Sequence, residues 1–277
     1  MTGTPVTISV NGADVEAAAG ATVLAACRTA GIDVPTLCWA ANLTPVNACR
    51  ICVVEVEGSR TLVPSCSREA EEDMVVETDS ERVRHSRKLV LELLGSGVDL
   101  SQADDLAQLM VDYGADPHRF EGAARIDEPV KVQDELYIRD HDKCVLCFRC
   151  VEACGDDAQH TFAIAVSGRG FDARISTEFD VALPDSACVY CGNCIGVCPT
   201  NALQFKTEFD LRQAAEWRPE DQTVTTTICS YCAVGCNLDV HVQDGKIVKV
   251  TSPDDHDITN GHLCIKGRFG WRYVQPS

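Results

Sequence analysis

Residues 144–154 read CVLCFRCVEAC, and residues 188–199 read CVYCGNCIGVCP. Each stretch spaces four cysteines as C-x2-C-x2-C-x3-C, and a proline follows the second set. Such dense runs of thiols indicate metal binding, because thiolates are soft ligands for zinc and for iron–sulfur clusters. Zinc sites use pairs of C-x2-C rather than runs of four, so the repeated spacing favours iron–sulfur clusters.

This spacing resembles that of bacterial two-cluster ferredoxins, in which three close cysteines bind one [4Fe–4S] cluster and the fourth reaches the other. The resemblance implies a 2[4Fe–4S] ferredoxin domain over residues 136–212 with crossed ligation. One cluster would be held by Cys144, Cys147, Cys150 and Cys198. The other would be held by Cys188, Cys191, Cys194 and Cys154.

Of the 17 cysteines, 16 fall into four groups of four, and the first group is spaced C-x10-C-x2-C-x13-C. Before it, VTISV, the turn pair Asn11-Gly12 and ADVEAAAG predict a hairpin, and a helix is expected at about 22–30. A hairpin and helix leading into a cysteine loop is the plan of a β-grasp ferredoxin domain. The spacing alone leaves zinc and iron open. The four cysteines are Cys38, Cys49, Cys52 and Cys66.

The stretches TVLAACRTAGIDVPTLC, NACRICVVEVEG and LVPSCS are similar to a known N-terminal [2Fe–2S] domain. That domain is shared by NAD-linked formate dehydrogenases, iron-only hydrogenases and the large peripheral-arm subunit of respiratory NADH dehydrogenase. The resemblance implies a β-grasp [2Fe–2S] domain over residues 1–80.

The fourth group is spaced C-x2-C-x3-C-x27-C, and a hairpin about Asp244-Gly245 is predicted to return the chain to its last cysteine. This spacing fits zinc or a [4Fe–4S] cluster equally well. CSYCAVGCNLDV and GHLCIKGRFGW resemble the small [4Fe–4S] domain that opens the molybdopterin subunits of formate dehydrogenases. The resemblance implies a β-rich domain over residues 222–277 with the ligands Cys229, Cys232, Cys236 and Cys264.

By the same resemblance, Lys266 of C-x-K-G-R would lie between this cluster and a pterin, as a possible electron-exit contact. The alternative for Lys266 is an ordinary surface charge. The chain ends at Ser277, before any molybdenum ligand, so a separate partner is expected against Lys266 and Arg268.

Related families carry one more cluster, bound by a histidine and three cysteines, between the first two domains. The stretch VLELLGSGVDLSQADDLAQLMVDYG has neither residue type, so residues 81–135 are expected to be a helical segment lacking these ligands. Ser101 and Asp104 predict a capping-box start, with apolar residues following at helical spacing. His85 is expected to be a solvated helix residue. Four clusters, not five, are therefore predicted.

Two further features are interpreted as structural. Cys27 lies on an Ala/Leu-rich helical face and is expected to be a small buried hydrophobe. Gly168-x-Gly170-x-x-Ala173 formally matches a dinucleotide fingerprint, but that motif needs a helix after the glycines. FDARISTEF reads as a strand instead, so a hairpin between the two ferredoxin motifs is predicted.

The 24 Lys and Arg residues against 42 Asp and Glu give a net charge of −18, which disfavours nucleic acid and anionic lipid. No apolar run is long enough for membrane insertion. MTGTPVTISVNG lacks the basic start and apolar stretch of a signal peptide, so a reducing, cytoplasmic location is expected.

Together these features predict an α+β electron-transfer chain with no catalytic residue, because clusters held by four thiolates have no open position for a substrate. A reduced nicotinamide, NAD(P)H, gives up two electrons at once as hydride, so an FMN-binding diaphorase subunit is expected to split the pair. A separate catalytic subunit would be a molybdenum or tungsten formate dehydrogenase or CO2 reductase.

Alternatives for the function remain open. One is the equivalent subunit of a soluble NAD-reducing nickel-iron hydrogenase or of an electron-bifurcating hydrogenase or transhydrogenase. Another, of a different class, is a non-redox zinc-bound assembly module. A last one is a truncated fragment of a longer enzyme.

Overall fold

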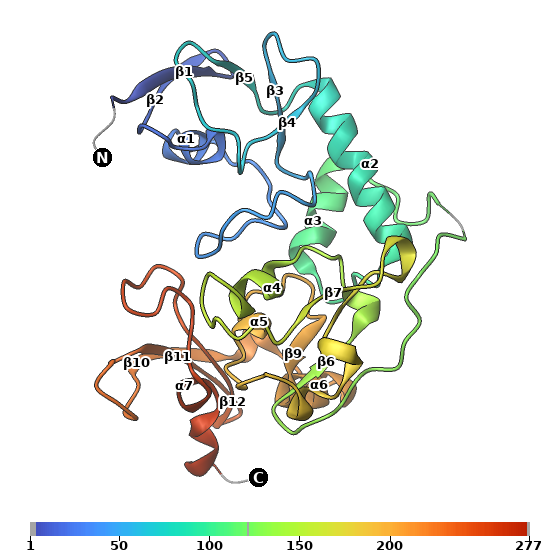
Figure 1. Cartoon of the computed structure of the whole chain (residues 1–277), viewed down its shortest axis with the longest axis vertical. Helices are drawn as coiled ribbons and strands as arrows, with labels where there is room; N and C mark the ends of the chain where they lie inside the picture. Colours follow the sequence, from blue (N-terminus) through green and yellow to red (C-terminus); the bar gives the residue numbers. More distant parts are fainter. Residues whose placement is uncertain (1–3, 121, 276–277) are drawn as a thin grey trace. The chain divides into compact units, whose positions relative to one another are not determined.

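The computed structural model describes residues 4–120 and 122–275 and divides the chain into two compact units (Figure 1). The first comprises residues 1–40 and 45–124, and the second comprises residues 41–44 and 125–277. Helices and strands occur in both units, so the mixed helix and strand content expected from the sequence is confirmed.

The first unit is built on a mixed sheet with the strand order β2-β1-β5-β3-β4. Strands β1 and β2 form an antiparallel hairpin, whereas β1 and β5 run parallel. Helix α1 contacts β2, and its buried residues join the core of the sheet. This is the arrangement expected of a β-grasp domain. The elements are β1 (Val6–Val10), β2 (Ala13–Ala17), α1 (Val23–Thr29), β3 (Val53–Val56), β4 (Val63–Pro64) and β5 (Val75–Glu77).

Two local signals shape the start of this unit. Asn11 and Gly12 have φ values of 51° and 81°, the left-handed conformation that a two-residue type I′ turn requires. The hydroxyl oxygen of Thr22 caps α1 by accepting a 3.2 Å hydrogen bond from the N–H of Ala25. The predicted hairpin and helix are therefore confirmed. Cys27 lies buried in this core, as predicted, and burial raises the pKa of its thiol.

Helices α2 (Glu81–Gly97) and α3 (Asp104–Tyr113) follow the sheet and contact each other. The hydroxyl oxygen of Ser80 caps α2 by accepting a 3.3 Å hydrogen bond from the N–H of Val83. Of the segment 81–135 that was expected to be helical, these two stretches are helical, whereas the described residues 114–120 and 122–135 contain no helix.

The capping box predicted at Ser101 and Asp104 is wrong. Ala103 is the residue before α3 and supplies no side-chain cap. The N–H of Ser101 instead donates to Oδ1 of Asp99 at 3.0 Å, in a turn that precedes the helix. Ser101 therefore stands too early in the chain to cap α3.

The ferredoxin region of the second unit is small and centred on two short helices. An antiparallel pair, β6 with β9, lies in the same core, and β7 with β8 forms the predicted hairpin between the cysteine motifs. The glycine pattern at 168–173 belongs to that hairpin, so the interpretation as a hairpin is confirmed. The elements are β6 (Tyr137–Arg139), α4 (Arg149–Cys154), β7 (Ala165–Ser167), β8 (Arg174–Ser176), α5 (Asn193–Gly196), β9 (Leu203–Phe205) and α6 (Lys206–Gln213).

The rest of the second unit is an antiparallel sheet, β10-β11-β12, followed by a short helix (Figure 1). The predicted hairpin about Asp244-Gly245 joins β11 to β12 and is confirmed. Strand β10 was not predicted, because its residues TVTTTI are exposed throughout and show no apolar alternation. The elements are β10 (Thr223–Ile228), β11 (Asn237–Gln243), β12 (Lys246–Thr251) and α7 (Ile265–Phe269).

Candidate electron-transfer sites

The two C-x2-C-x2-C-x3-C motifs fold alike. Phe148 precedes α4 with φ 63°, and Gly192 precedes α5 with φ 70°. This left-handed residue lets each chain turn sharply from its second cysteine into a short helix. The third cysteine of each motif, Cys150 or Cys194, then lies within that helix. The repeated spacing is therefore a repeated loop-helix structure.

The structure brings the cysteines of these motifs together in two mixed sets. One cavity is lined by three cysteines of the first motif and the last of the second, namely Cys144, Cys147, Cys150 and Cys198. A second cavity is lined by the complementary set, namely Cys154, Cys188, Cys191 and Cys194. These are the sets that crossed ligation requires; ligation itself stays a prediction.

Burial controls the ionisation of these thiols. Burial, with repulsion from Cys198, raises the pKa of Cys144 to about 11 and that of Cys147 to about 12. Burial also raises the pKa of Cys150 and of Cys194 well above the ordinary value of a thiol. Four thiolates this close together need a cationic core between them, and iron in an iron–sulfur cluster supplies that charge.

Two buried arginines lie beside these sets. Arg139 lines the first cavity, and among the described residues its Nε and Nη1 have no hydrogen-bond partner. Arg268 lies near Cys191 and Cys194, and its Nη1 likewise has no partner within the described chain. Buried donors are rarely left unpaired, and cluster sulfurs accept such hydrogen bonds. The surroundings of both sets therefore fit iron–sulfur clusters.

The first cysteine group comes together as two pairs in the first unit. The N–H of Cys38 donates to Sγ of Cys49, and the N–H of Cys49 donates to Sγ of Cys38, both at 3.4 Å. The hydrogen bond with Cys49 lowers the pKa of Cys38 to about 5, and the hydrogen bond with Cys66 lowers that of Cys52 to about 6. The pKa of Cys66 is raised chiefly by its hydrogen bond with Cys52, and the nearby charges of Cys38 and Cys49 raise it further. All four cysteines are therefore neighbours.

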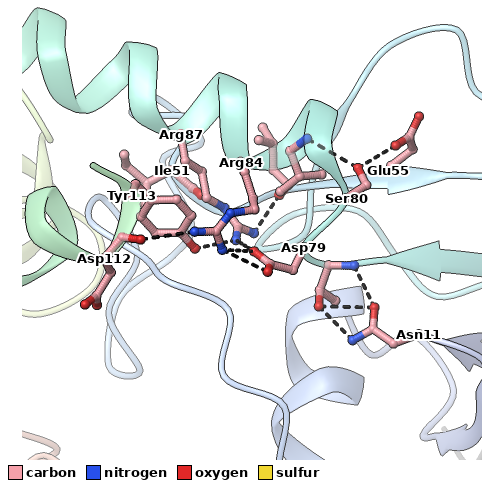
Figure 2. A network of polar contacts seen from close by, with 12 residues as sticks. Asn11, Ile51, Glu55, Asp79, Ser80, Arg84, Arg87, Asp112 and Tyr113 are labelled. Carbon is pink, nitrogen blue, oxygen red and sulfur yellow. Dashed lines mark hydrogen bonds and ion pairs between the residues drawn. The ribbon is translucent and has the colours of Figure 1, made fainter. Parts of the chain in front are cut away.

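A buried arginine of α2 holds the loop that carries this group (Figure 2). Arg87 is 2% exposed, and its Nε donates to the carbonyl oxygen of Ile51 at 3.0 Å. Its Nη2 donates to the carbonyl oxygen of Val53 at 2.9 Å, and its Nη1 donates to the hydroxyl of Tyr113 at 2.7 Å. Ile51 and Val53 flank Cys52, so the arginine fixes the backbone on both sides of that cysteine.

Sequence patterns did not point to Arg87. It lies between Val83 and Leu91 at the helical spacing of a buried face, and all three are buried. The sequence does hold one signal for Arg87, namely a charged residue within an apolar helical stripe. An arginine at such a position is rarely buried unless several acceptors pair with it.

The fourth group is joined by the C-terminal sheet of the second unit. Cys229 follows β10, and its N–H donates to the carbonyl oxygen of Cys236 at 2.8 Å. Burial raises the pKa of Cys236, with further contributions from Cys229, Cys264 and Cys232. The four cysteines are therefore neighbours. Cys232 and Cys264 are exposed, so this group lies at the surface of its unit.

The two basic residues after Cys264 have different surroundings. Lys266 is exposed, so its interpretation as an exit contact or as a surface charge stays open. Arg268 is 0% exposed and packs against the second ferredoxin motif. The expectation of a partner against Arg268 is therefore wrong, because its side chain points into its own unit.

The helical segment between the first two cysteine regions behaves as expected at His85, which is exposed on α2. In the part of the chain that the structure describes, no three His, Cys, Asp or Glu side chains are placed to hold a single metal ion. Within those same residues, no helix is both long and apolar enough to cross a lipid bilayer.

One contact in the second ferredoxin set leads to a direct test. The hydroxyl of Tyr137 lies 2.9 Å from Sγ of Cys188 and can donate to a thiolate there. Tyr137→Phe removes only this donor and should lower the reduction potential of any cluster that this set binds, since hydrogen bonds to sulfur favour the reduced form. It should also destabilise the region by about 1–3 kcal/mol. Redox titration followed by electron paramagnetic resonance, with thermal unfolding, measures both effects.

Tyr190→Phe is the control for Tyr137→Phe. The two rings lie 5.8 Å apart, and the described structure gives no hydrogen bond from the Tyr190 hydroxyl to a cysteine. Its potential should match that of the unmodified protein. An unchanged potential in Tyr137→Phe would contradict the proposed role of the hydroxyl.

Three known domain families match successive parts of the chain. The 2Fe-2S iron-sulfur cluster binding domain matches residues 3–81, and the 4Fe-4S dicluster domain matches residues 143–202. The molybdopterin oxidoreductase Fe4S4 domain matches residues 222–276. Iron–sulfur domains of both cluster types are thus present, in the order predicted from the sequence.

The chain is also similar to several curated proteins. It is 33% identical to an NADH-quinone oxidoreductase subunit of Rhizobium meliloti over 97% of its own length and 31% of that protein. The same figures hold for the NADPH-Fe(3+) oxidoreductase subunit alpha of Geobacter sulfurreducens. Other relatives carry the names of hydrogenase subunits and, provisionally, of formate dehydrogenases. The chain spans about a third of the length of these first two relatives.

A solved structure resembles a large part of the chain. A chain of the NAD+-reducing [NiFe]-hydrogenase in the H2-reduced state matches with a TM-score of 0.65 and 27% sequence identity. The match covers 73% of this chain and 87% of the other. The chain is therefore a homologue of subunits of oxidoreductase complexes, as the resemblance of its motifs indicated.

Proposed function

We propose that this homologue of oxidoreductase subunits carries single electrons through four iron–sulfur clusters within an NAD(P)-linked complex. The observation that supports this most strongly is the convergence of 16 cysteines into four sets of four, two of which mix residues from distant motifs. The expected domains are residues 1–80, 81–135, 136–212 and 222–277.

The ligand assignment follows these sets. The pairs Cys38 with Cys49 and Cys52 with Cys66 match the need of a [2Fe–2S] core for four thiolates shared between two iron atoms. Each of the other three sets would hold a [4Fe–4S] cluster. The protein chain contributes burial, neighbouring charges and hydrogen-bond donors such as Arg139 and Tyr137, which tune the reduction potentials.

The partners belong to the same proposal. Bound clusters exchange one electron at a time, whereas a nicotinamide exchanges two as hydride, so an FMN-binding diaphorase subunit would supply or collect the pairs. A catalytic component of the formate dehydrogenase or CO2 reductase type would stand at the other end, since the C-terminal family match points to molybdopterin enzymes. A nickel-iron hydrogenase is the second candidate, favoured by the solved structure that resembles this chain.

Anaerobic purification from the native host tests this proposal. We expect about 14 iron atoms per chain and signals of both cluster types in electron paramagnetic resonance after reduction. We also expect reduction of NAD(P)+ by the intact complex with formate, or with H2 if the hydrogenase candidate is right. Co-purifying chains and their molybdenum, tungsten or nickel content identify the partner. About 4 zinc atoms per chain and no visible absorption would refute the electron-transfer function.

A further inference from the structure

Arg268 joins the C-terminal domain to the second ferredoxin motif. It lies on α7, four residues after Cys264, and its side chain is 0% exposed. Its Nε donates to the carbonyl oxygen of Cys191 at 2.9 Å, and its Nη2 donates to Oδ1 of Asn193 at 3.1 Å. The same Oδ1 accepts a 2.9 Å hydrogen bond from the N–H of Leu263. One arginine therefore contacts the loop that carries Cys191 and Cys194.

The ferredoxin loop leaves room for this side chain. A Cβ atom on Gly192 would lie 2.4 Å from Cδ of Arg268, closer than real Cβ contacts. A Cβ atom on Gly196 would lie 3.5 Å from Nη1 and Nη2 of the same arginine. Gly192 is also left-handed, with φ 70°, whereas Phe148 occupies the equivalent position of the first motif. The second motif is thus shaped to accept an arginine from the C-terminal domain.

The charge of Arg268 faces cysteines of two sets. Its electrostatic neighbours are Cys191, Cys194 and Cys264, together with the carboxylate of Asp254. An arginine guanidinium stays protonated at neutral pH, so this side chain brings a fixed positive charge to the loop that it contacts. The cation therefore stabilises negative charge on the sulfurs beside it.

We propose that Arg268 is a positioning residue that fixes the Cys191–Cys194 loop and raises the reduction potential of the cluster held with Cys154 and Cys188. Its unpaired Nη1 is the donor left to reach a sulfur of that cluster. The inference rests on the proposed ligand assignment. It assigns to Arg268, beside this set, the part that the buried Arg139 can play beside the other ferredoxin set.

The direction of the expected change in reduction potential follows from the charge of Arg268. Reduction adds one electron to the cluster and makes no bond, so a nearby fixed cation favours the reduced form. Removing that cation should lower the ratio of reduced to oxidised cluster at a fixed solution potential by roughly tenfold or more. For a one-electron couple, a tenfold change corresponds to about 59 mV.

A pair of substitutions separates charge from shape. Arg268→Lys keeps the positive charge, while Arg268→Gln keeps a hydrogen-bond donor without the charge. Both variants are purified as the full chain, their iron is counted, and the midpoint potentials are measured by titration with electron paramagnetic resonance detection. We expect one [4Fe–4S] potential to fall more than the others in Arg268→Gln, because most of the cysteines beside Arg268 belong to one set, and we expect it to stay near the unmodified value in Arg268→Lys. The [2Fe–2S] potential should be unchanged in both.

Arg272→Gln is the matched control. Arg272 follows on the same C-terminal segment, and its Nη2 donates to the carbonyl oxygen of Glu135 rather than to a cysteine loop. The same loss of charge there should leave every potential unchanged. A fall equal to that of Arg268→Gln would overturn the proposal, because it would reflect net charge alone.

The other possible results for the two Arg268 variants also test the proposed role of this residue. Equal potentials in Arg268→Lys and Arg268→Gln, with full iron in both, would overturn the inference while leaving the electron-transfer function intact. Loss of a cluster from Arg268→Gln alone would support it, since the buried charge would then be required for the cluster to bind. Loss of a cluster from both variants would overturn the proposal. Cluster binding would then require the two-pronged hydrogen bonding of the guanidinium rather than its charge. An unmodified protein without iron would refute the proposed function itself.

Discussion

Replacing Cys198 with alanine is expected to remove the [4Fe–4S] cluster whose other ligands lie in the first motif, although Cys198 itself lies in the second. Cys198 lines the cavity of Cys144, Cys147 and Cys150, and alanine offers no ligand there. Iron should fall from about 14 to about 10 atoms per chain. The region should also lose stability, because cluster binding and folding are coupled. Iron analysis and thermal unfolding measure the two effects.

Two double variants distinguish crossed from sequential ligation. Cys144→Ala with Cys198→Ala removes two ligands of one proposed cluster, so it should retain about 10 iron atoms, like the single variant. Cys194→Ala with Cys198→Ala removes one ligand from each cluster and should retain about 6. The reverse order of iron contents would show that each motif holds its own cluster.

Substitution of Arg87 by methionine should destabilise the first unit by roughly 3–5 kcal/mol, because each buried acceptor left without its donor costs about 1–3 kcal/mol. Methionine keeps part of the apolar stem but leaves the carbonyls of Ile51 and Val53 and the hydroxyl of Tyr113 without their donor. Because those carbonyls flank Cys52, the [2Fe–2S] signal should be lost at a lower temperature. Thermal unfolding followed by visible absorption and circular dichroism measures this change.

Arg84 provides the control for Arg87, because it lies on the same helix and binds Asp79 at 2.9 Å (Figure 2). Its side chain is 48% exposed, so Arg84→Met should change stability by no more than about 1 kcal/mol. Similar small effects in the two variants would show that Arg87 does not support the cysteine loop.

Most of the local structure around the cysteines could be predicted from the sequence, because turn chemistry and ligand spacing are short-range signals. Asn11-Gly12 and Asp244-Gly245 each mark a hairpin that the structure contains. The two mixed cysteine sets are those that the resemblance to bacterial two-cluster ferredoxins implied. The family matches over residues 3–81, 143–202 and 222–276 confirm the type and order of the iron–sulfur domains.

The residues that support the cysteine loops could not be found in this way. The burial of Arg87 and Arg268 depends on acceptors that are 26 to 77 positions away in the chain. At Ser101 the sequence instead predicted a helix cap that the structure does not contain. The N–H of Ser101 bonds to Asp99 in a turn before the helix. Tertiary packing therefore determines the burial of the two arginines, and local turn chemistry determines the conformation at the serine.

The mixing of cysteines from two distant motifs has a consequence for biosynthesis. While the chain emerges from the ribosome, Cys144, Cys147 and Cys150 appear first, but Cys198 completes their cavity only after the hairpin β7–β8 has been made. Under the proposed ligation, neither cluster of this region can be fully ligated on a nascent chain that stops before the second motif. Delivery of iron and sulfide to this region is then tied to the last steps of its synthesis, and a prematurely terminated chain would be released with open, oxidisable thiols.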